Sequence, residues 1–228
     1  MANLSLSTES ISTLNSDSNG SEGEPQHLSR SLSITSDDSH ASQRAGDFIH
    51  DAAASILDSL QKGDESANMQ LELTALRMST NASEHQVRRA VVIAFMKRIS
   101  QLVESGTGVK QAVNEVMGEH QTLLERTMFD KSKSGKVDQV DFLLLTQQDV
   151  ARRRDGESIL LFVSNELYDM DIIQAEGFEQ WWSDVKSSES DEMKRVRSKM
   201  QQFIDIVTAE ESEDEDEEDE EQESSDEE

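Results

Sequence analysis

The sequence predicts an all-α fold in which antiparallel helix pairs stack as a solenoid. Apolar residues recur at helical spacing through residues 46–209, and no segment there shows sustained alternation of apolar and polar residues. The single proline, Pro25, lies outside this region, and the connections between the expected helices are short. Short connections suit about eight or nine helices in stacked pairs better than they suit a four-helix bundle.

The net charge of -27 divides unevenly and indicates three segments. Residues 1–45 contain 13 serines and no Phe, Trp, Tyr, Val or Lys, so we expect a disordered leader that buries too little apolar surface to fold. Residues 210–228 hold 15 acids and no base, which predicts a disordered acidic tail. Residues 46–209 form the expected folded domain, with a net charge of only about -8.

Start and stop signals set the expected helices. The first has apolar residues every four positions and stops at Gly63, and the second follows at 69–78. A capping box at Ser83 and Gln86 opens a long helix that Gly106 ends. Later helices are expected at 109–117, 123–128, 138–153, 157–169, 171–183 and 189–208.

Composition argues against several functional classes. The chain has no cysteine, so disulfides, thiolate catalysis and cysteine-ligated zinc are excluded. Its five histidines never lie three or four residues apart, and it has no glycine-rich phosphate loop. The acidic balance disfavours nucleic-acid binding, and no apolar run approaches the roughly 20 residues of a membrane span. We expect a cytoplasmic protein without cofactor or metal that binds basic protein surfaces.

The segment Asp130–Asp141 leaves calcium binding open as an alternative. Its sequence, DKSKSGKVDQVD, resembles an EF-hand loop with Gly135 at the sharp turn. Two of the usual carboxylates are serines, the final ligand is the shorter aspartate, and three lysines lie inside the loop. The other interpretation is a polar turn between helices.

Aromatic residues concentrate toward the end of the folded region. Eight of the ten lie between Phe129 and Phe203, and the stretch at 166–185 interleaves them with acids. Trp181 and Trp182 point about 100° apart on a helix, so one can enter the core while the other faces outward. The pattern predicts an acidic-aromatic surface for lysine-rich partners, acting by charge steering and cation–π contact. Its candidate residues are Tyr168, Asp169, Asp171, Glu176, Glu179, Trp181 and Trp182.

Three stretches together resemble the C-terminal catalytic domain of the epsilon subunit of translation initiation factor 2B, with a related domain in initiation factor 5. They are QLELTALRMSTNAS (70–83), ELYDMDIIQAEGFEQWW (166–182) and QQFIDIVTAEESEDEDEE (201–218). The resemblance spans about residues 47–218. It implies a HEAT-like stack of antiparallel helix pairs and guanine-nucleotide exchange on initiation factor 2, which needs no covalent chemistry.

The resemblance also implies roles for individual residues. Glu72, with Leu71 beside it, matches the acid required for nucleotide exchange, and Trp181 matches a functionally important tryptophan. The implied partners are the lysine-rich segment of the beta subunit of initiation factor 2 and the G domain of its gamma subunit, with other initiation factors and 2B subunits as further candidates. The tail would add a second acidic box, with candidate residues Glu210, Glu211, Glu213 and Asp214.

Other functions stay open beside nucleotide exchange. The family's N-terminal nucleotidyltransferase-like and β-helix domains are absent from the sequence, so we expect a detached C-terminal portion whose leader is an interdomain linker. One alternative is a module that binds lysine-rich initiation-factor segments without exchange activity. The other is the EF-hand-like calcium-binding protein.

Overall fold

The computed structural model describes residues 37–129 and 136–209, with side chains from Gly46 onward. The predicted tail and residues 1–36 of the predicted leader lie outside these residues. The described part contains nine α-helices and no strand, which confirms the predicted all-α class. Two short 3-10 helices, η1 and η2, flank the last of them, and residues 201–209 are helical after η2. The helices are α1 (Asp37–Lys62), α2 (Ser66–Thr80), α3 (Glu84–Glu104), α4 (Val109–Gly118), α5 (Gln121–Glu125), α6 (Lys136–Val150), α7 (Gly156–Asp169), α8 (Ala175–Ser183), η1 (Val185–Ser188), α9 (Asp191–Arg197) and η2 (Ser198–Met200).

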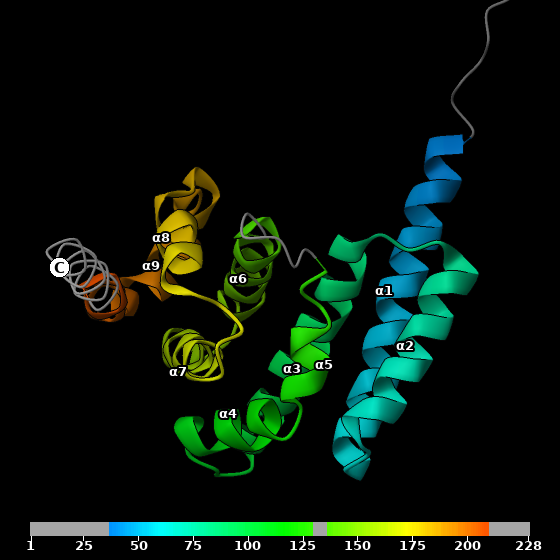
Figure 1. Cartoon of the computed structure of the whole chain (residues 1–228), viewed down its shortest axis with the longest axis horizontal. Coiled ribbons are helices and arrows are strands. Elements are labelled where there is room, and N and C mark those ends of the chain that lie inside the picture. Colours follow the sequence, from blue (N-terminus) through cyan, green and yellow to red (C-terminus); the bar gives the residue numbers. More distant parts are fainter. Residues whose placement is uncertain (1–36, 130–135, 210–228) are drawn as a thin grey trace, which may run out of the picture. The chain divides into compact units, whose positions relative to one another are not determined.

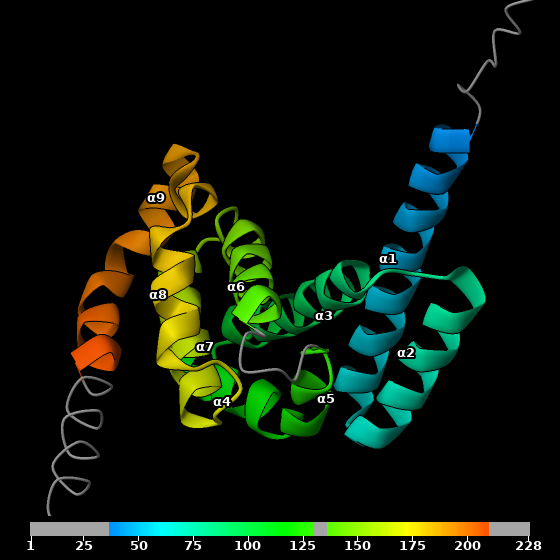
Figure 2. The same ribbon diagram turned by 45° about the horizontal axis from the view of Figure 1, so that its top comes forward.

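The helices pack in two rows, as in a HEAT-like stack (Figures 1 and 2). In the first row α1 contacts α3, α3 contacts α6, and α6 contacts α8. In the second row α2 contacts α5, while α4 contacts α7 and α7 contacts α9. Contacts between α1 and α2 and between α6 and α7 join the rows. The α1/α2 pair therefore lies at one end of the stack, and α8, α9 and the helical residues 201–209 lie at the other.

Local signals in the sequence position the first three helices. Gly63 and Gly106 adopt positive φ angles of 74° and 104°, and each follows a helix end. The predicted capping box is confirmed: Gln86 N–H donates to Ser83 Oγ at 3.3 Å, and Ser83 N–H donates to Gln86 Oε1 at 2.7 Å. The two glycines and the capping box therefore mark the places where the chain leaves one helix or enters the next.

Two predicted boundaries need correction. Helix α1 begins at Asp37, nine residues before the folded domain predicted from residue 46. Residues 38–45 contain neither proline nor glycine, and extending a helix that is anchored at Phe48 costs less than starting a new one. The helix predicted at 171–183 begins only at Ala175, because Asp171 has a φ of 56° and ends the turn after α7.

The buried face of each helix contributes to one apolar core. Its largest fully buried side chains include Trp181, Phe95, Phe142 and Phe178, which come from α8, α3 and α6. Each such side chain contributes roughly 1.5–3 kcal/mol relative to exposure. The core therefore fixes α3, α6 and α8 against one another. In a separate respect, none of the helices in the described residues combines the length and the apolar character that a membrane span needs.

Candidate functional site

Helix α2 presents the first predicted site on its outer face. Met69 and Leu73 are buried and attach the helix to the core, whereas Leu71 is 73% exposed and Glu72 is also exposed. Met78 lies seven residues after Leu71 and is 79% exposed, so both apolar side chains fall on one side of the helix. Glu72 thus stands beside an exposed apolar stripe rather than on a uniformly polar face.

Contacts at both ends of α2 hold that outer face in place. Ser66 Oγ lies 3.0 Å from His120 Nδ1 at the start of the helix. At the other end the Arg77 guanidinium lies 4.4 Å from the centre of the Phe129 ring. The Lys62 ammonium is also near, and its pKa is raised, first by its hydrogen bond to Asp58 and to a smaller extent by Glu72. A helix with contacts at both ends therefore carries the Glu72 carboxylate.

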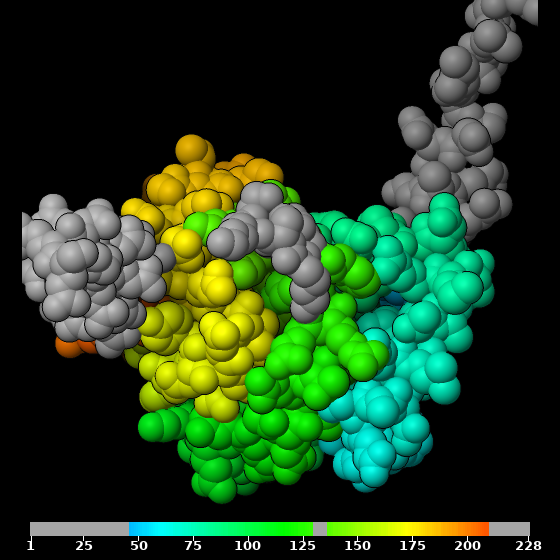
Figure 3. Space-filling model, in the orientation of Figure 1, coloured from blue at the N-terminus to red at the C-terminus, as the bar shows by residue number. Residues whose placement is uncertain are grey.

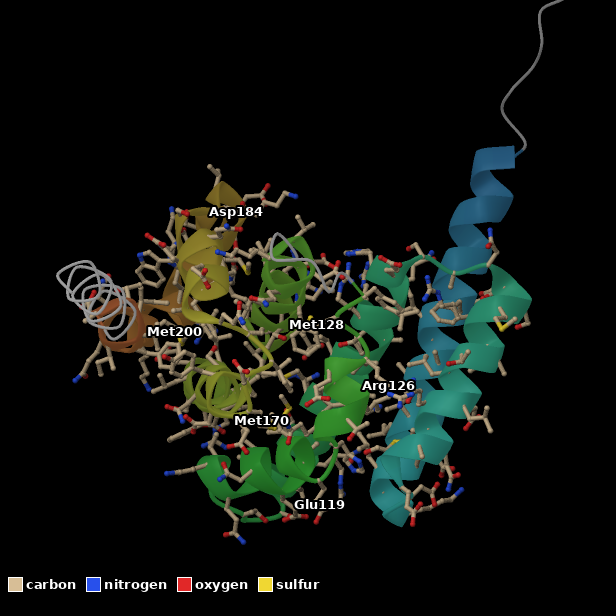
Figure 4. All side chains as sticks on the ribbon, in the orientation of Figure 1. Glu119, Arg126, Met128, Met170, Asp184 and Met200 are labelled. Atoms are coloured by element: carbon tan, nitrogen blue, oxygen red, sulfur yellow. The ribbon has the colours of Figure 1, made fainter. Side chains whose placement is uncertain are left out.

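The acidic-aromatic surface lies at the other end of the stack, on α7, α8 and the turn between them. Asp169, Asp171 and Glu179 are exposed, and Asn165 Nδ2 donates to Asp169 Oδ2 at 2.7 Å. Glu176 is half-buried and its carboxylate lies 2.7 Å from Lys136 Nζ. In Figure 4 the labels Met170 and Asp184 mark the two ends of this segment. The predicted acids thus share one region of the surface, but they are not equally available to a partner.

One further acid belongs to this region. Glu166, on α7, is partly buried, and its pKa is raised, mainly by that burial and further by the nearby Asp169 carboxylate. Lys110 on α4 acts in the opposite direction. Glu166 and Asp169 therefore repel one another, although Lys110 already offsets part of that repulsion.

The two neighbouring tryptophans have different environments. Trp181 is fully buried, and its indole Nε1 donates to Gln147 Oε1 at 3.0 Å. Trp182 is half-buried, with the Arg197 guanidinium 3.7 Å from the centre of its ring. Because Trp181 lies in the core, any contribution it makes to partner binding must act by positioning α8. Trp182 is the tryptophan that reaches the surface.

The sequence did not reveal the residues that support this end of the stack. Gln147 is buried on α6, and its Nε2 donates to the carbonyl oxygens of Ser187 at 2.8 Å and Met193 at 3.0 Å. With the bond from Trp181, this amide joins α6 to α8, η1 and α9. The available signal was its spacing, because Gln147 lies four residues after Leu143 and three before Val150, on the apolar side of α6. Tyr168 also packs inward, edge-on against Phe178 and Phe203 with ring centres 6.2 Å apart in each pair.

The described part of the calcium-like loop does not favour a cation site. Residues 130–135 lie outside the described residues, and α6 already begins at Lys136. The buried Arg88 guanidinium lies 2.7 Å from Asp138 Oδ1 and 2.6 Å from Asp141 Oδ2. His85 Nδ1 is 2.8 Å from the second oxygen of Asp141. Asp138 and Asp141, two carboxylates that an EF-hand loop would use as ligands, therefore already face the Arg88 guanidinium. The described residues contain no cluster of acids and histidines that could hold a metal.

Helices α2 and α8 both reach one side of the domain. Figure 3 shows a face in which α2 and α8 are both exposed, with α5 and the start of α6 between them. The tail residues Glu210, Glu211, Glu213 and Asp214 lie outside the described residues. A partner large enough to cover this face would contact both ends of the stack.

Comparison with known proteins relates the chain to a family and to a relative. Residues 138–227 match the W2 family model, described as eIF4-gamma/eIF5/eIF2-epsilon. The chain is also 30% identical over 168 residues, 74% of its length, to the translation initiation factor eIF2B subunit epsilon of Schizosaccharomyces pombe. It spans 24% of the length of that relative. An aligned stretch of 168 residues in a chain of 228 must include residues 61–168, so it contains Leu71, Glu72 and Tyr168.

Proposed function

The chain carries a C-terminal domain of the eIF2B epsilon and eIF5 type, and we propose that it binds initiation factor 2 and promotes the release of GDP from that factor. A role in translation initiation accords with both matches. The observation that carries the exchange proposal is the exposed Glu72 beside the exposed Leu71 on α2. Such a role places the protein in the cytoplasm.

The proposed mechanism is differential binding. An exchange factor accelerates GDP release when it binds the nucleotide-free or opened state of the G protein more tightly than the GDP-bound state. A carboxylate such as Glu72 can compete for a phosphate-binding lysine or for the switch backbone in the G domain of the gamma chain of initiation factor 2. The exposed Leu71 and Met78 would bury apolar surface on the same partner.

The acidic-aromatic surface would dock the lysine-rich segment of the beta subunit. Asp171 and Glu179 are exposed on one region with Asp169, and Glu166 is already held close to a like charge. Lysines entering this region would relieve that repulsion and gain charge-assisted contacts. Since α2 and α8 reach one face, a single multisubunit partner could engage both surfaces (Figure 3).

A measurement of GDP release tests the exchange proposal. Purified chain should accelerate release of labelled GDP from initiation factor 2, and Glu72→Ala should abolish the acceleration while binding to initiation factor 2 persists. Glu104→Ala, which removes an exposed acid from the end of α3, is the matched control and should behave as wild type. If Glu72→Ala loses binding together with release, Glu72 is a docking residue.

The binding-module alternative has a specific observation in its favour. The W2 match begins at residue 138 and so includes the acidic-aromatic surface but not α2. If the wild-type chain binds initiation factor 2 without changing GDP release, this alternative replaces the exchange proposal.

A salt series tests the docking step. Removal of residues 210–228 should weaken binding to a lysine-rich peptide at low salt, and the difference from the full chain should fade toward 1 M salt, where the Debye length is about 3 Å. Asp171→Asn with Glu179→Gln should weaken binding in the same salt-dependent way. A deficit that is independent of salt would contradict the electrostatic account.

A further inference from the structure

A groove of about 480 Å³ runs between α1 and α3. The two helices point in the same direction, because Gln61 Nε2 near the end of α1 donates to Gln101 Oε1 near the end of α3 at 2.9 Å. Gly46 lies at the opposite end, where a Cβ would meet no atom within 4 Å. The groove thus reaches from Gly46 at one end to the glutamine pair at the other.

The floor of the groove is apolar. Alanine side chains line its centre and leave it unfilled. Three larger apolar side chains along its sides are only half-buried. Half-buried aliphatic groups gain free energy when a second apolar surface removes them from water, by about 25 cal/mol per Å². The small residues are Ala53, Ala54 and Ala94, and the larger ones are Ile49, Leu57 and Ile93.

Two bases and one acid line the groove, and among the described residues only the bases lack an ion pair. Arg89 and Lys97 lie eight residues apart on α3, and both are exposed. Among the described residues neither forms an ion pair, whereas Asp58 on the α1 side is already paired with Lys62. The groove therefore has a basic edge on a chain whose net charge is -27.

We propose that this groove binds an amphipathic helix of a partner protein whose polar edge is acidic. Two adjacent helices with an apolar floor are a suitable seat for a third helix that presents apolar residues at i, i+3, i+4 and i+7. Eight residues of α3 span about 12 Å, so acids about two turns apart on the partner would meet Arg89 and Lys97 together. The site is separate from α2 and from the acidic-aromatic surface, whose partners are basic.

Two features favour a foreign helix over a second copy of the chain. A symmetric dimer through this groove would bring the Arg89 and Lys97 pairs of both copies into one interface. At physiological salt the Debye length is about 8 Å, so the bases beside the groove outweigh distant acids on the same chain. The local charge therefore selects an acidic helix.

A designed peptide tests the proposal. The probe is a fluorescein-labelled helix of about four turns with leucines at i, i+3, i+4 and i+7 spacing and glutamates along one edge, and its partner probe has lysines in place of the glutamates. Fluorescence anisotropy with the full chain should show binding of the acidic probe. Arg89→Glu with Lys97→Glu should weaken it by at least about tenfold and should favour the lysine probe. Amide chemical shifts should change along α1 and α3.

Two variants serve as controls. Arg152→Glu with Arg154→Glu makes the same change in charge at exposed positions outside the groove and should leave acidic-probe affinity within about twofold. Ala54→Trp fills the groove without changing its charge and should also abolish binding. The proposal is overturned if the acidic probe fails to bind, if both probes bind the wild-type chain equally, or if the shifts fall on α2 or α8. Sedimentation of a dimer that the groove variants dissociate would instead assign the groove to a second copy.

Discussion

The indole Nε1 of Trp181 donates to Gln147 Oε1 at 3.0 Å, and both side chains are buried. The same glutamine amide donates to two carbonyl oxygens, so one residue of α6 fixes the position of the whole segment from α8 to α9. Trp181→Phe would keep an aromatic ring but leave Gln147 Oε1 without its donor. We expect the free energy of unfolding to fall by about 1–3 kcal/mol.

Urea denaturation of the full chain measures this change. Trp182→Phe is the control, because Trp182 is half-buried and a phenyl ring can still face Arg197. The free energy of unfolding of Trp182→Phe should fall by less than about 1 kcal/mol. Equal losses in the two variants would show that the hydrogen bond to Gln147 contributes nothing of its own.

The buried ion pair between α3 and α6 supplies a second prediction. Arg88→Met removes the guanidinium that faces Asp138 and Asp141 and leaves buried negative charge in its place. We expect a loss of about 3–5 kcal/mol in the free energy of unfolding. The adjacent Arg89→Met changes an exposed base and should cost no more than about 0.5 kcal/mol. If the two variants unfold at the same denaturant concentration, the ion pair is not a support of the fold.

Gly156, at the start of α7, allows a close approach of two backbone segments. A Cβ at this position would lie 2.0 Å from the carbonyl oxygen of Val150, which cannot move aside as a flexible side chain would. Gly156→Ala should therefore destabilise the domain by about 1–3 kcal/mol through overpacking. Gly118→Ala is the matched control, since its nearest neighbour would be Glu166 Oε1 at an ordinary 3.5 Å. Thermal unfolding should show a lower Tm for the first variant alone.

His120 gives the fold a dependence on pH. Its pKa lies below the usual value because burial disfavours the charged ring, although Glu119 partly offsets this effect. The unfolded chain takes up a proton near pH 6.5, before the folded chain does, so stability should fall as the pH drops from about 7 through that value toward the lower folded pKa. His120→Gln removes this contribution.

Denaturation curves at about pH 7.5 and about pH 5.5 measure that dependence. The loss of stability between the two should be smaller in His120→Gln than in the wild-type chain. Parallel losses would assign the pH dependence to other groups. Glu166 is not one of them, because its raised pKa makes stability rise as the pH drops toward its usual value of 4.5.

The features that could be predicted from the sequence are those that depend on residues close together in the chain. The capping box at Ser83 and the stop at Gly63 are signals of a few residues, and the structure confirms both. The acid cluster around α8 is likewise contiguous in sequence. Arg88 and Asp141, by contrast, are 53 residues apart, and no local pattern joins them. Helical geometry predicted that one tryptophan could point inward, but only packing against Gln147 decides that it is Trp181.

Successive layers of the stack hold one another in place mainly through contacts with their nearest neighbours, as α1 with α3, α3 with α6 and α6 with α8. In such an arrangement opening of a terminal layer does not require the far layer to open. Amide hydrogen exchange should therefore divide the domain into zones. Amides of α3 and α6 should exchange most slowly, and those of α9 should exchange sooner without the release of α1 and α3. The surface that meets a basic partner could then rearrange while the α1/α3 groove keeps its form.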